Sequence, residues 1–188
     1  MEKSETVKKK TMLLAITGSI GAVSLPSYVP ALISQLYCNI DIIMSQAATR
    51  FVSPYTLELL TRRKVFVDMF DESETIKVPH IELTKRSDLF VIMPATANII
   101  GKAANGICDD LISLCIIASS KPVVFVPNMN ENMWENKAVK TNIMKLKENG
   151  HNVIEPGVGI EVSSGKRTRG SMPGIKEMID FLKKMLED

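Results

Sequence analysis

The sequence predicts an α/β fold: a single-domain Rossmann-like (flavodoxin-like) doubly wound parallel sheet with helices on both faces. Short apolar runs rich in β-branched residues lack the alternation of half-buried strands, which is typical of parallel strands covered by helices on both sides. Helical patterns alternate with these runs along the chain. The length of 188 residues suits one domain with a sizeable core.

Five of these apolar runs are predicted as strands, at residues 12–17, 40–45, 89–94, 123–127 and 152–156. Helices are predicted between and after them, at residues 54–63, 110–120, 136–150 and 175–188. The helix that ends at Gly150 has lysines in its last turns, which is a typical C-terminal signal. Residues 1–10 are predicted as a polar tail, which leaves 11–188 as the folded domain.

The first crossover helix, within residues 22–37, contains both Pro26 and Pro30. Proline breaks the hydrogen bonding of a helix interior but is accepted in the first turn. Two alternatives are therefore open. The helix is kinked, or a new helix begins with Ser27 as its N-cap and Pro30 in its first turn.

Composition and charge exclude several classes of protein. Lys plus Arg exceed Asp plus Glu by 23 − 21 = +2, too little to indicate binding to nucleic acid or to a membrane surface. The polar start "MEKSETVKKK" has no apolar segment behind it that would form a secretory signal. No apolar run approaches the roughly 20 residues that span a bilayer. We therefore expect a cytoplasmic protein without membrane insertion.

The three cysteines, Cys38, Cys108 and Cys115, form no CxxC pair and are odd in number. Reduced thiols, no disulfide framework and no metal site are the simplest prediction. Cys108 and Cys115 are seven residues apart in a probable helix, so we expect both to face the core, where free cysteines are common.

Small residues, hydroxyls and amides follow four of the predicted strands, in the turns 17–21, 45–49, 94–98 and 127–130. Ligands of open parallel sheets bind at the carboxyl ends of strands, where small residues let backbone N–H groups approach an anion. Neither GxGxxG nor a P-loop is present, so these turns are a weak signal for a nucleotide or a flavin. The alternative is a set of well-made turns.

Three motifs taken together are more specific: "PATAN" (94–98), "ANGICDDL" (104–111) and "PNMNENMW" (127–134), with His80 fourteen residues ahead of Pro94. Over roughly residues 11–173 the chain resembles the homo-oligomeric flavin-containing cysteine decarboxylases. It is most similar to the lantibiotic branch, the epidermin- and mersacidin-type (LanD) peptidyl-cysteine decarboxylases.

The resemblance implies a flavoprotein decarboxylase domain that uses FMN to decarboxylate oxidatively the C-terminal cysteine of a ribosomal precursor peptide. The enethiol product later closes an S-aminovinyl-cysteine ring. The implied partners are the precursor peptide, other copies of the chain in a trimer or dodecamer, and possible further lantibiotic-modifying enzymes.

Ten cofactor-binding residues are implied by the resemblance. Ser45 is the candidate phosphate partner, and Ile99 replaces a threonine that is usual at the end of the "PATAN"-type turn, which removes one polar contact. The full set is Gly18, Ser19, Ile20, Ser45, Gln46, Ala47, Thr96, Ala97, Asn98 and Asn128.

The resemblance also implies that His80 and Asn130 are catalytic. An imidazole exchanges protons near neutral pH and suits the substrate thiol, while a neutral amide holds the carboxylate without strongly stabilising it. The alternative for His80 is a hydrogen-bonded structural histidine at a helix start. Met129 is expected near the ring and the substrate. Residues 161–173 are expected to form a solvated loop that acts as a mobile substrate clamp, with Lys166, Arg167 and Arg169 attracting the peptide carboxylate.

Structural roles are expected for four neighbouring residues. His151 is expected in a loop, Trp134 in the packing behind the site, and Asp109 and Asp110 at the start of a helix, where acidic side chains suit the dipole. A subunit contact near the flavin is a second possibility for the aspartates.

Several other functions compete with the peptide enzyme. Phosphopantothenoylcysteine decarboxylase of coenzyme A biosynthesis shares the histidine and asparagine motifs, but needs a cysteine in the clamp to return electrons. Residues 161–173 contain no cysteine. An inactive flavin-binding regulatory subunit predicts loss of His80 or Asn130, and both are present. Flavin prenyltransferases and a purely structural α/β domain fit the motifs less well.

Overall fold

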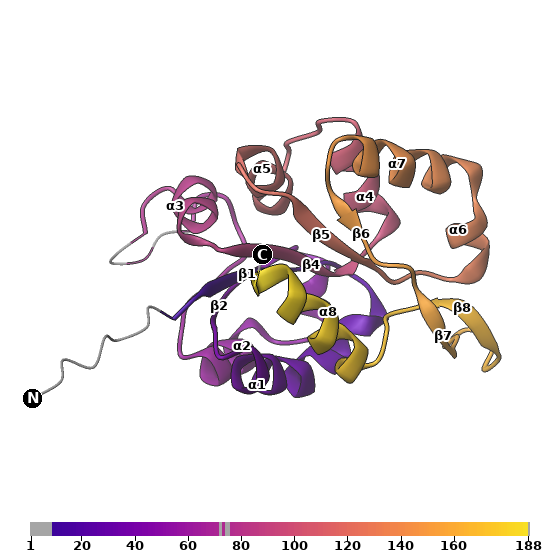
Figure 1. The fold of residues 1–188 in the computed structure, drawn as a ribbon, viewed down its shortest axis with the longest axis horizontal. Helices are drawn as coiled ribbons and strands as arrows, with labels where there is room; N and C mark the ends of the chain where they lie inside the picture. Colours follow the sequence, from indigo (N-terminus) through magenta and orange to yellow (C-terminus); the bar gives the residue numbers. More distant parts are fainter. Residues whose placement is uncertain (1–8, 72, 74–75, 188) are drawn as a thin grey trace, which may run out of the picture.

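The structure, a computed structural model, describes residues 9–71, 73 and 76–187 and contains a six-stranded parallel sheet (Figure 1). The order is β3-β2-β1-β4-β5-β6, the Rossmann order, rather than the 2-1-3-4-5 order of flavodoxin-like sheets. The Rossmann-like prediction is therefore confirmed. The strands are β1 (Thr11–Ile16), β2 (Asn39–Met44), β3 (Val65–Phe66), β4 (Leu89–Ala95), β5 (Val123–Pro127) and β6 (Asn152–Val153).

Helices cover both faces of the sheet, as Figure 1 shows. One face carries α1 (Leu25–Leu36), α2 (Pro54–Thr61) and α8 (Ile175–Glu187), with short 3-10 turns η1 (Ile20–Ser24) and η2 (Ala48–Arg50) ahead of α1 and α2. The other face carries α3 (Pro79–Arg86), α4 (Ala97–Ala104), α5 (Leu111–Ala118), α6 (Glu131–Glu135) and α7 (Lys137–Glu148).

Alternate side chains of the central strands enter two separate cores. Leu14 and Ile16 of β1 pack against the side of α1 and α8, whereas Leu13 and Ala15 pack against the side of α5. All four side chains are fully buried. Burial on both faces explains why the strand sequences show no alternation.

The sequence did not reveal three of the strands. β3 has two residues, too few to make a pattern. β7 (Gly157–Ile160) and β8 (Arg167–Ser171) pair as an antiparallel hairpin. The expectation of a loop over residues 161–173 is thus wrong for β8, because the polar sequence of this strand shows no strand pattern. The predicted strand 152–156 contributes only Asn152 and Val153 to the sheet.

The first crossover helix, α1, begins at Leu25 and runs through both prolines. Pro26 lies in the first turn, and Pro30 lies inside, where it has no N–H to donate to the carbonyl of Pro26. Ser27 is not an N-cap, because its Oγ donates to the carbonyl of Ser24 at 2.7 Å. The alternative of a helix restarting at Ser27 is wrong.

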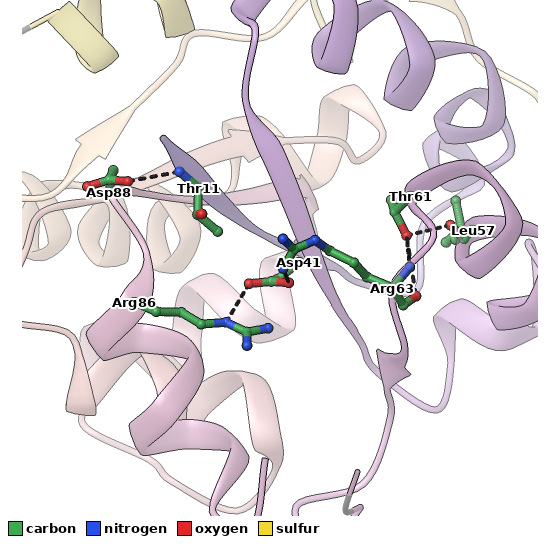
Figure 2. A network of polar contacts seen from close by, with 7 residues as sticks. All are labelled: Thr11, Asp41, Leu57, Thr61, Arg63, Arg86 and Asp88. Atoms are coloured by element: carbon green, nitrogen blue, oxygen red, sulfur yellow. Dashed lines mark hydrogen bonds and ion pairs between the residues drawn. The ribbon is translucent and has the colours of Figure 1, made fainter. Parts of the chain in front are cut away.

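A buried carboxylate joins three segments on the α3 side of the sheet (Figure 2). Asp41 of β2 is 1% exposed. Its Oδ2 accepts from Nε of Arg86 at 2.7 Å, and its Oδ1 accepts from a terminal nitrogen of Arg63 at 2.9 Å. Arg63 lies two residues before β3 and Arg86 ends α3, so this network fixes both ends of the segment that carries α3.

The cysteines correct one expectation. Cys38 and Cys115 are buried, and burial raises the pKa of the Cys38 thiol to about 11 and that of Cys115 to about 12. Cys108 is exposed, because it lies in the turn before α5 and not in the helix. The prediction that both Cys108 and Cys115 face the core is wrong for Cys108.

Two further findings concern the chain ends and membranes. Residues 1–8 of the predicted polar tail and residue 188 of the last helix lie outside the described residues. Within the described ranges, no helix has the length and apolar character needed to cross a bilayer.

Candidate functional site

The strand order reverses between β1 and β4, and the segments that follow these strands are joined by hydrogen bonds. Thr17 Oγ1 donates to the carbonyl of Pro94 at 2.6 Å and accepts from the N–H of Thr96 at 3.0 Å. Open α/β sheets bind ligands in the crevice at such a reversal. The predicted ligand edge therefore coincides with the reversal point of the sheet.

The turns after β1 and β2 touch each other at this edge. A Cβ atom at Gly18 would lie 2.5 Å from the Cβ of Ala47. No real side chain tolerates that distance, so glycine is required at position 18. Two of the predicted cofactor residues are thus brought together.

Asn128, just after β5, links three other segments at the same edge. Its Oδ1 accepts from Ser19 Oγ at 2.5 Å and from the N–H of Gly21 at 3.2 Å. Its Nδ2 donates to the carbonyl of Gly170 in β8 at 3.4 Å, and its own N–H donates to Ala95 at 3.0 Å. The side chain predicted to contact a flavin therefore also holds the surrounding turns in place.

A cavity of about 210 Å³ opens beside Asn128. It contains five of the predicted site residues, which come from the turn after β1 and from the turn after β5, and the hairpin forms its other wall. The lining consists of Ser19, Ile20, Asn128, Met129, Asn130, Ile160, Glu161, Val162, Ser163, Thr168, Gly170 and Ser171.

Asn130 is the N-cap of α6 and is exposed at this cavity. Its Oδ1 accepts from the N–H of Met133 at 2.8 Å. No group of the described residues accepts a hydrogen bond from its Nδ2. The cap fixes the side chain and leaves the amide nitrogen available to donate to a ligand.

The hairpin β7–β8 docks onto the Asn130 segment through its backbone. The N–H of Met129 donates to the carbonyl of Gly170 at 3.0 Å. Gly170 has φ +133, and a Cβ atom there would lie 2.1 Å from the carbonyl oxygen of Met129. Only glycine permits this approach, and the approach holds the hairpin over the cavity.

The predicted carboxylate-attracting side chains do not line this cavity. Lys166, Arg167 and Arg169 are exposed. The Arg169 guanidinium pairs with Glu155 at 3.2 Å. The hairpin instead presents Ile160 and Val162 to the cavity together with the polar residues Glu161, Ser163, Thr168 and Ser171, so that wall is mixed in character.

A second cavity, of about 330 Å³, lies on the other side of the turn after β2. It is lined by the predicted residues Ser45, Gln46 and Ala47, and also by Asp109 and Asp110. Ser45 Oγ accepts from the N–H of Ala48 at 3.2 Å. Both cavities lie at the carboxyl edge of the sheet.

Asp110 caps α5, as predicted. Its Oδ1 accepts from the N–H of Ser113 at 2.8 Å, and the N–H of Asp110 donates back to Ser113 Oγ at 3.1 Å. Burial acts to raise the pKa of this carboxyl, but hydrogen bonds from Lys102 and Ser113 outweigh it and the pKa is lowered. Lys102 also pairs with Asp109 at 2.6 Å.

The residues predicted from "PATAN" begin α4. Thr96 is the N-cap, and its Oγ1 accepts from the N–H of Ile99 at 3.4 Å. Ala97 and Asn98 form the first turn, with Asn98 exposed. The replacement of a polar residue by Ile99 is explained by packing, because Ile99 is 3% exposed in the core.

His80 is the second residue of α3 and is half-buried. Glu82 accepts from the N–H groups of Lys77 and Val78, both at 2.8 Å, and so holds the turn before His80. Thr84 Oγ1 donates to the carbonyl of His80 at 2.6 Å. The Nδ1 atom of His80 is buried and has no partner in the described part of the chain.

His80 and Asn130 are not neighbours within one chain. His80 is absent from the lining of the cavity that contains Asn130. In Figure 1, α3 and α6 lie at opposite ends of the molecule. The structure therefore brings together Asn130, Asn128 and the turn after β1, but not His80.

Trp134 and His151, for which structural roles were predicted, make structural contacts. Trp134 is 1% exposed and packs in the core directly behind Asn130, as predicted. His151 Nδ1 accepts from the N–H of Val123 at 3.2 Å, and burial lowers the pKa of this imidazole. His151 is thus a packed acceptor at the start of β5.

Sequence reasoning missed the Asp41 network and the requirement for glycine at position 170. One signal was present: Asp41 is the single charged residue in the apolar run "IDIIMS", and such a residue needs buried partners. No comparable signal marks Gly170, because its role depends on contact with Met129, a residue distant in sequence.

Comparisons with known proteins place these features in a family. A family model described as Flavoprotein matches residues 1–187. The chain is 38% identical over 153 residues to the coenzyme A biosynthesis bifunctional protein CoaBC of Bacillus subtilis (strain 168), covering 81% of this chain and 37% of that protein. It is 31% identical over 163 residues to the mersacidin decarboxylase of Bacillus sp. (strain HIL-Y85/54728), covering 86% of this chain and 82% of that protein. The chain thus spans less than half of the CoaBC protein.

Two solved structures share the whole fold. The FMN-dependent cysteine decarboxylase SpaF superposes with a TM-score of 0.82 at 29% identity, covering 96% of this chain and 98% of that chain. A PPC decarboxylase with a cysteine-to-serine substitution, complexed with pantothenoylaminoethenethiol, gives a TM-score of 0.83 at 26% identity and covers 96% and 100%.

Proposed function

The chain belongs to the Flavoprotein family, and from that membership we propose that it is an FMN-dependent decarboxylase acting on the C-terminal cysteine of a ribosomal precursor peptide. The product is an enethiol, which leads to an S-aminovinyl-cysteine ring. The mersacidin decarboxylase and SpaF similarities support this assignment.

The main observation in favour of a peptide substrate is the absence of a thiol at the cavity. No cysteine lines the cavity that contains Asn130, and residues 157–171, the hairpin that walls it, contain none. An enzyme that makes a saturated thiol must return two electrons to its enethiol intermediate. Without a cysteine to return them, the reaction ends at the oxidised product.

The residues at the sheet edge fit FMN. Gly18 lets the turns after β1 and β2 approach each other, and Ser19, Asn130 and Ser45 line two cavities at this edge. When bound there, FMN supplies the electron acceptor that cysteine needs, because its carboxylate loses CO₂ only after the carbon beside sulfur has been oxidised.

Asn130 is assigned the substrate carboxylate. Its Nδ2 has no partner among the described residues and is available to donate to the carboxylate, while its Oδ1 is held by the helix cap. A neutral amide orients the carboxylate without the strong ion pair that would stabilise the ground state and oppose loss of CO₂.

His80 is assigned the substrate sulfur, and this assignment needs a second copy of the chain. Because α3, which carries His80, and α6 lie at opposite ends of one molecule, the two groups meet only if His80 of one protomer faces Asn130 of its neighbour. The proposed homo-oligomer, a trimer or dodecamer, supplies such a contact.

A second candidate function is phosphopantothenoylcysteine decarboxylase. The 38% identity to the CoaBC protein favours it, as does the similarity to the PPC decarboxylase structure. Both candidates decarboxylate a terminal cysteine group on flavin, so the difference lies in the substrate and in the fate of the electrons.

Mass spectrometry of two reactions tests the proposal. A synthetic peptide ending in cysteine should lose CO₂ and two hydrogens when incubated with the FMN-loaded protein and dioxygen, and the same peptide ending in serine should remain unchanged. Turnover of phosphopantothenoylcysteine alone would assign the coenzyme A role. No turnover of either substrate by protein that retains FMN would favour a flavin-binding regulatory subunit.

A further inference from the structure

One carboxylate lines the cavity that contains Asn130. Among the described residues of this lining, Glu161 is the only one with a charged side chain, and all the others are apolar or carry neutral hydroxyls and amides. It lies at the end of β7, in the hairpin that walls the cavity. The charge has no part in binding FMN or in holding the substrate carboxylate as described above, so its presence needs another explanation.

The side chain of Glu161 packs against the molecule more closely than those of its neighbours. Ile160 and Val162, on either side of it, are 70% and 72% exposed, whereas Glu161 is half-buried. A carboxylate that is partly shielded from water interacts more strongly with other charges than one at the open surface. Glu161 is therefore placed to influence what enters the cavity.

Local hydrogen bonds hold Glu161 in position. Its N–H donates to the carbonyl of Lys166 at 2.8 Å, and its own carbonyl accepts from the N–H of Gly165 at 2.8 Å. Ser164 Oγ donates to its Oε2 at 2.5 Å. Its other oxygen, Oε1, has no partner among the described residues and can accept from a ligand.

The cations of the hairpin do not neutralise this carboxylate. The Arg169 guanidinium pairs with Glu155 at 3.2 Å, and the N–H of Arg169 donates to Glu131 at 3.4 Å. Lys166 and Arg167 are exposed and do not line the cavity. Within the described residues, no ion pair joins any of these cations to the carboxylate in the cavity wall. The cavity therefore presents a negative charge to its ligand.

The position of Glu161 along the hairpin indicates which part of a peptide it faces. The hairpin docks at Gly170, whose carbonyl accepts from the N–H of Met129, the residue before Asn130. Lys166, which is hydrogen-bonded to Glu161, lies four residues before Gly170 in the chain. A strand rises about 3.3 Å per residue, which places Glu161 about 13 Å from the docked end. With the terminal carboxylate at Asn130, Glu161 lies beside the residues that precede the terminal cysteine.

We propose that Glu161 is a specificity-determining residue, which selects peptides with lysine or arginine two or three residues before the terminal cysteine and disfavours acidic residues there. The inference rests on the proposed function, because it takes the carboxylate to be held by Asn130. A lysine or arginine can donate a charge-assisted hydrogen bond to the free Oε1, whereas an acidic side chain meets a like charge.

Peptide binding tests this preference without any reaction. Two peptides carry the same fluorophore at the N-terminus and end in Lys-Lys-Ala-Ser or in Glu-Glu-Ala-Ser, where serine replaces the reactive cysteine. Fluorescence anisotropy with FMN-loaded protein should give a Kd about tenfold lower for the basic peptide at low salt, and added NaCl should reduce this ratio. Equal Kd values, a preference for the acidic peptide, or no binding of either peptide would overturn the proposal.

Glu161→Gln removes the charge and keeps the size of the side chain, and its amide oxygen can still accept from Ser164. The ratio of the two Kd values should fall to about twofold or less. Glu177→Gln is the matched control for net charge, since Glu177 is exposed on α8 and does not line this cavity. It should keep the wild-type ratio. A wild-type ratio in Glu161→Gln, or the same fall in both variants, would remove Glu161 from selectivity.

The corresponding peptides that end in cysteine separate this inference from the proposed function. Binding that shows the expected charge preference, without loss of CO₂ from either cysteine peptide, would refute the proposed function and keep the assignment of Glu161. Decarboxylation of the basic and acidic peptides with equal kcat/KM would support the proposed function and refute the assignment of Glu161.

Discussion

The two ends of the Asn130 amide have different surroundings. Its oxygen caps α6, and its nitrogen has no partner in the described residues. An aspartate would keep the cap, since carboxylates are good N-caps, but would remove the donor and add a negative charge. The capping role and the proposed carboxylate-binding role can therefore be separated by one substitution.

Asn130→Asp is expected to lower kcat/KM for a peptide ending in cysteine by about 100-fold or more. A hydrogen bond to a charged group contributes about 1.5–3 kcal/mol, about 10- to 100-fold, and repulsion between two carboxylates adds to the loss. Steady-state kinetics with FMN-loaded protein measures the effect, and thermal unfolding should be nearly unchanged.

Asn136→Asp provides the matched control. Asn136 also caps a helix, α7, its Oδ1 accepting from the N–H of Ala138 at 2.9 Å, but it does not line the cavity. Activity should remain near that of wild type. An equal loss in both variants would remove Asn130 from substrate binding.

At the residue scale, the family resemblance named Asn128, Met129 and Asn130 together with Ser19 and Ile20, and these five residues line one cavity. The resemblance could not locate the lysine and arginines of the predicted clamp. These residues lie in or beside the β7–β8 hairpin, which the sequence did not reveal. Alternate side chains of a strand point to opposite sides, so which of them face the cavity could not be predicted without the hairpin. Arg169 turns instead to Glu155.

At the scale of elements, α3 is anchored by charge at its last residue. Arg86 joins the buried Asp41, which also binds the segment before β3 through Arg63 (Figure 2). Asp41→Asn should lower the free energy of unfolding by about 1–3 kcal/mol, because hydrogen bonds to a charged group are lost while the arginines, about a third exposed, keep partial access to water. Urea unfolding measures this change.

Glu135→Gln is the control for that measurement. It removes an ion pair with Lys140 whose side chains are 38% and 58% exposed, and exposed pairs contribute little. The midpoint of urea unfolding should shift by a small fraction of the Asp41 effect. Similar shifts in the two variants would contradict a special role for the buried network.

Replacing Gly170 by alanine should break the contact between the β7–β8 hairpin and the Met129 segment. The added Cβ would lie 2.1 Å from the carbonyl oxygen of Met129, at a φ of +133 that side chains rarely adopt. We expect destabilisation of the hairpin by about 2 kcal/mol or more. Trypsin, which cleaves after lysine and arginine, should cut at Lys166 and Arg167 much faster than in wild type.

Gly174→Ala controls for a general effect of alanine near the hairpin. A Cβ atom at position 174 has open space around it. Its tryptic pattern should match that of wild type. Unchanged cleavage in the Gly170 variant would mean that the hairpin does not depend on this contact.

The elements that could be predicted from sequence share a physical feature: each has enough residues to display a period. α2, α5, α7 and α8 and the long strands were located by apolar spacing. β3 has two residues paired to β2, and β8 reads "RTRGS", so both are defined by their partners and not by their own composition. Tertiary contacts also define α1. The burial of Leu25, Val29 and Leu32 outweighs the low helix propensity of its two prolines.

At the scale of the whole molecule, the separation of α3 from α6 makes a prediction about assembly. His80→Asn and Asn130→Asp should each have strongly reduced activity, yet the two variants co-expressed should recover much of it. If the residues of one site come from different chains, about one quarter of sites in a random mixture carry both wild-type groups. Turnover per flavin measures the recovery.

Separately purified and mixed variants at a concentration that prevents subunit exchange serve as the control and should retain their strongly reduced activity. Co-expressed protein that forms mixed oligomers without any recovery would place His80 and Asn130 in the same chain. That result would contradict the proposed arrangement of the site.

The burial of two thiols leaves the third chemically distinct. Maleimides react with thiolates, and Cys38 and Cys115 ionise only far above neutral pH, whereas Cys108 lies at the surface. Wild-type protein therefore accepts a single fluorophore, next to the acidic residues Asp109 and Asp110, without prior removal of other cysteines. Energy transfer between labelled copies can then follow self-association directly.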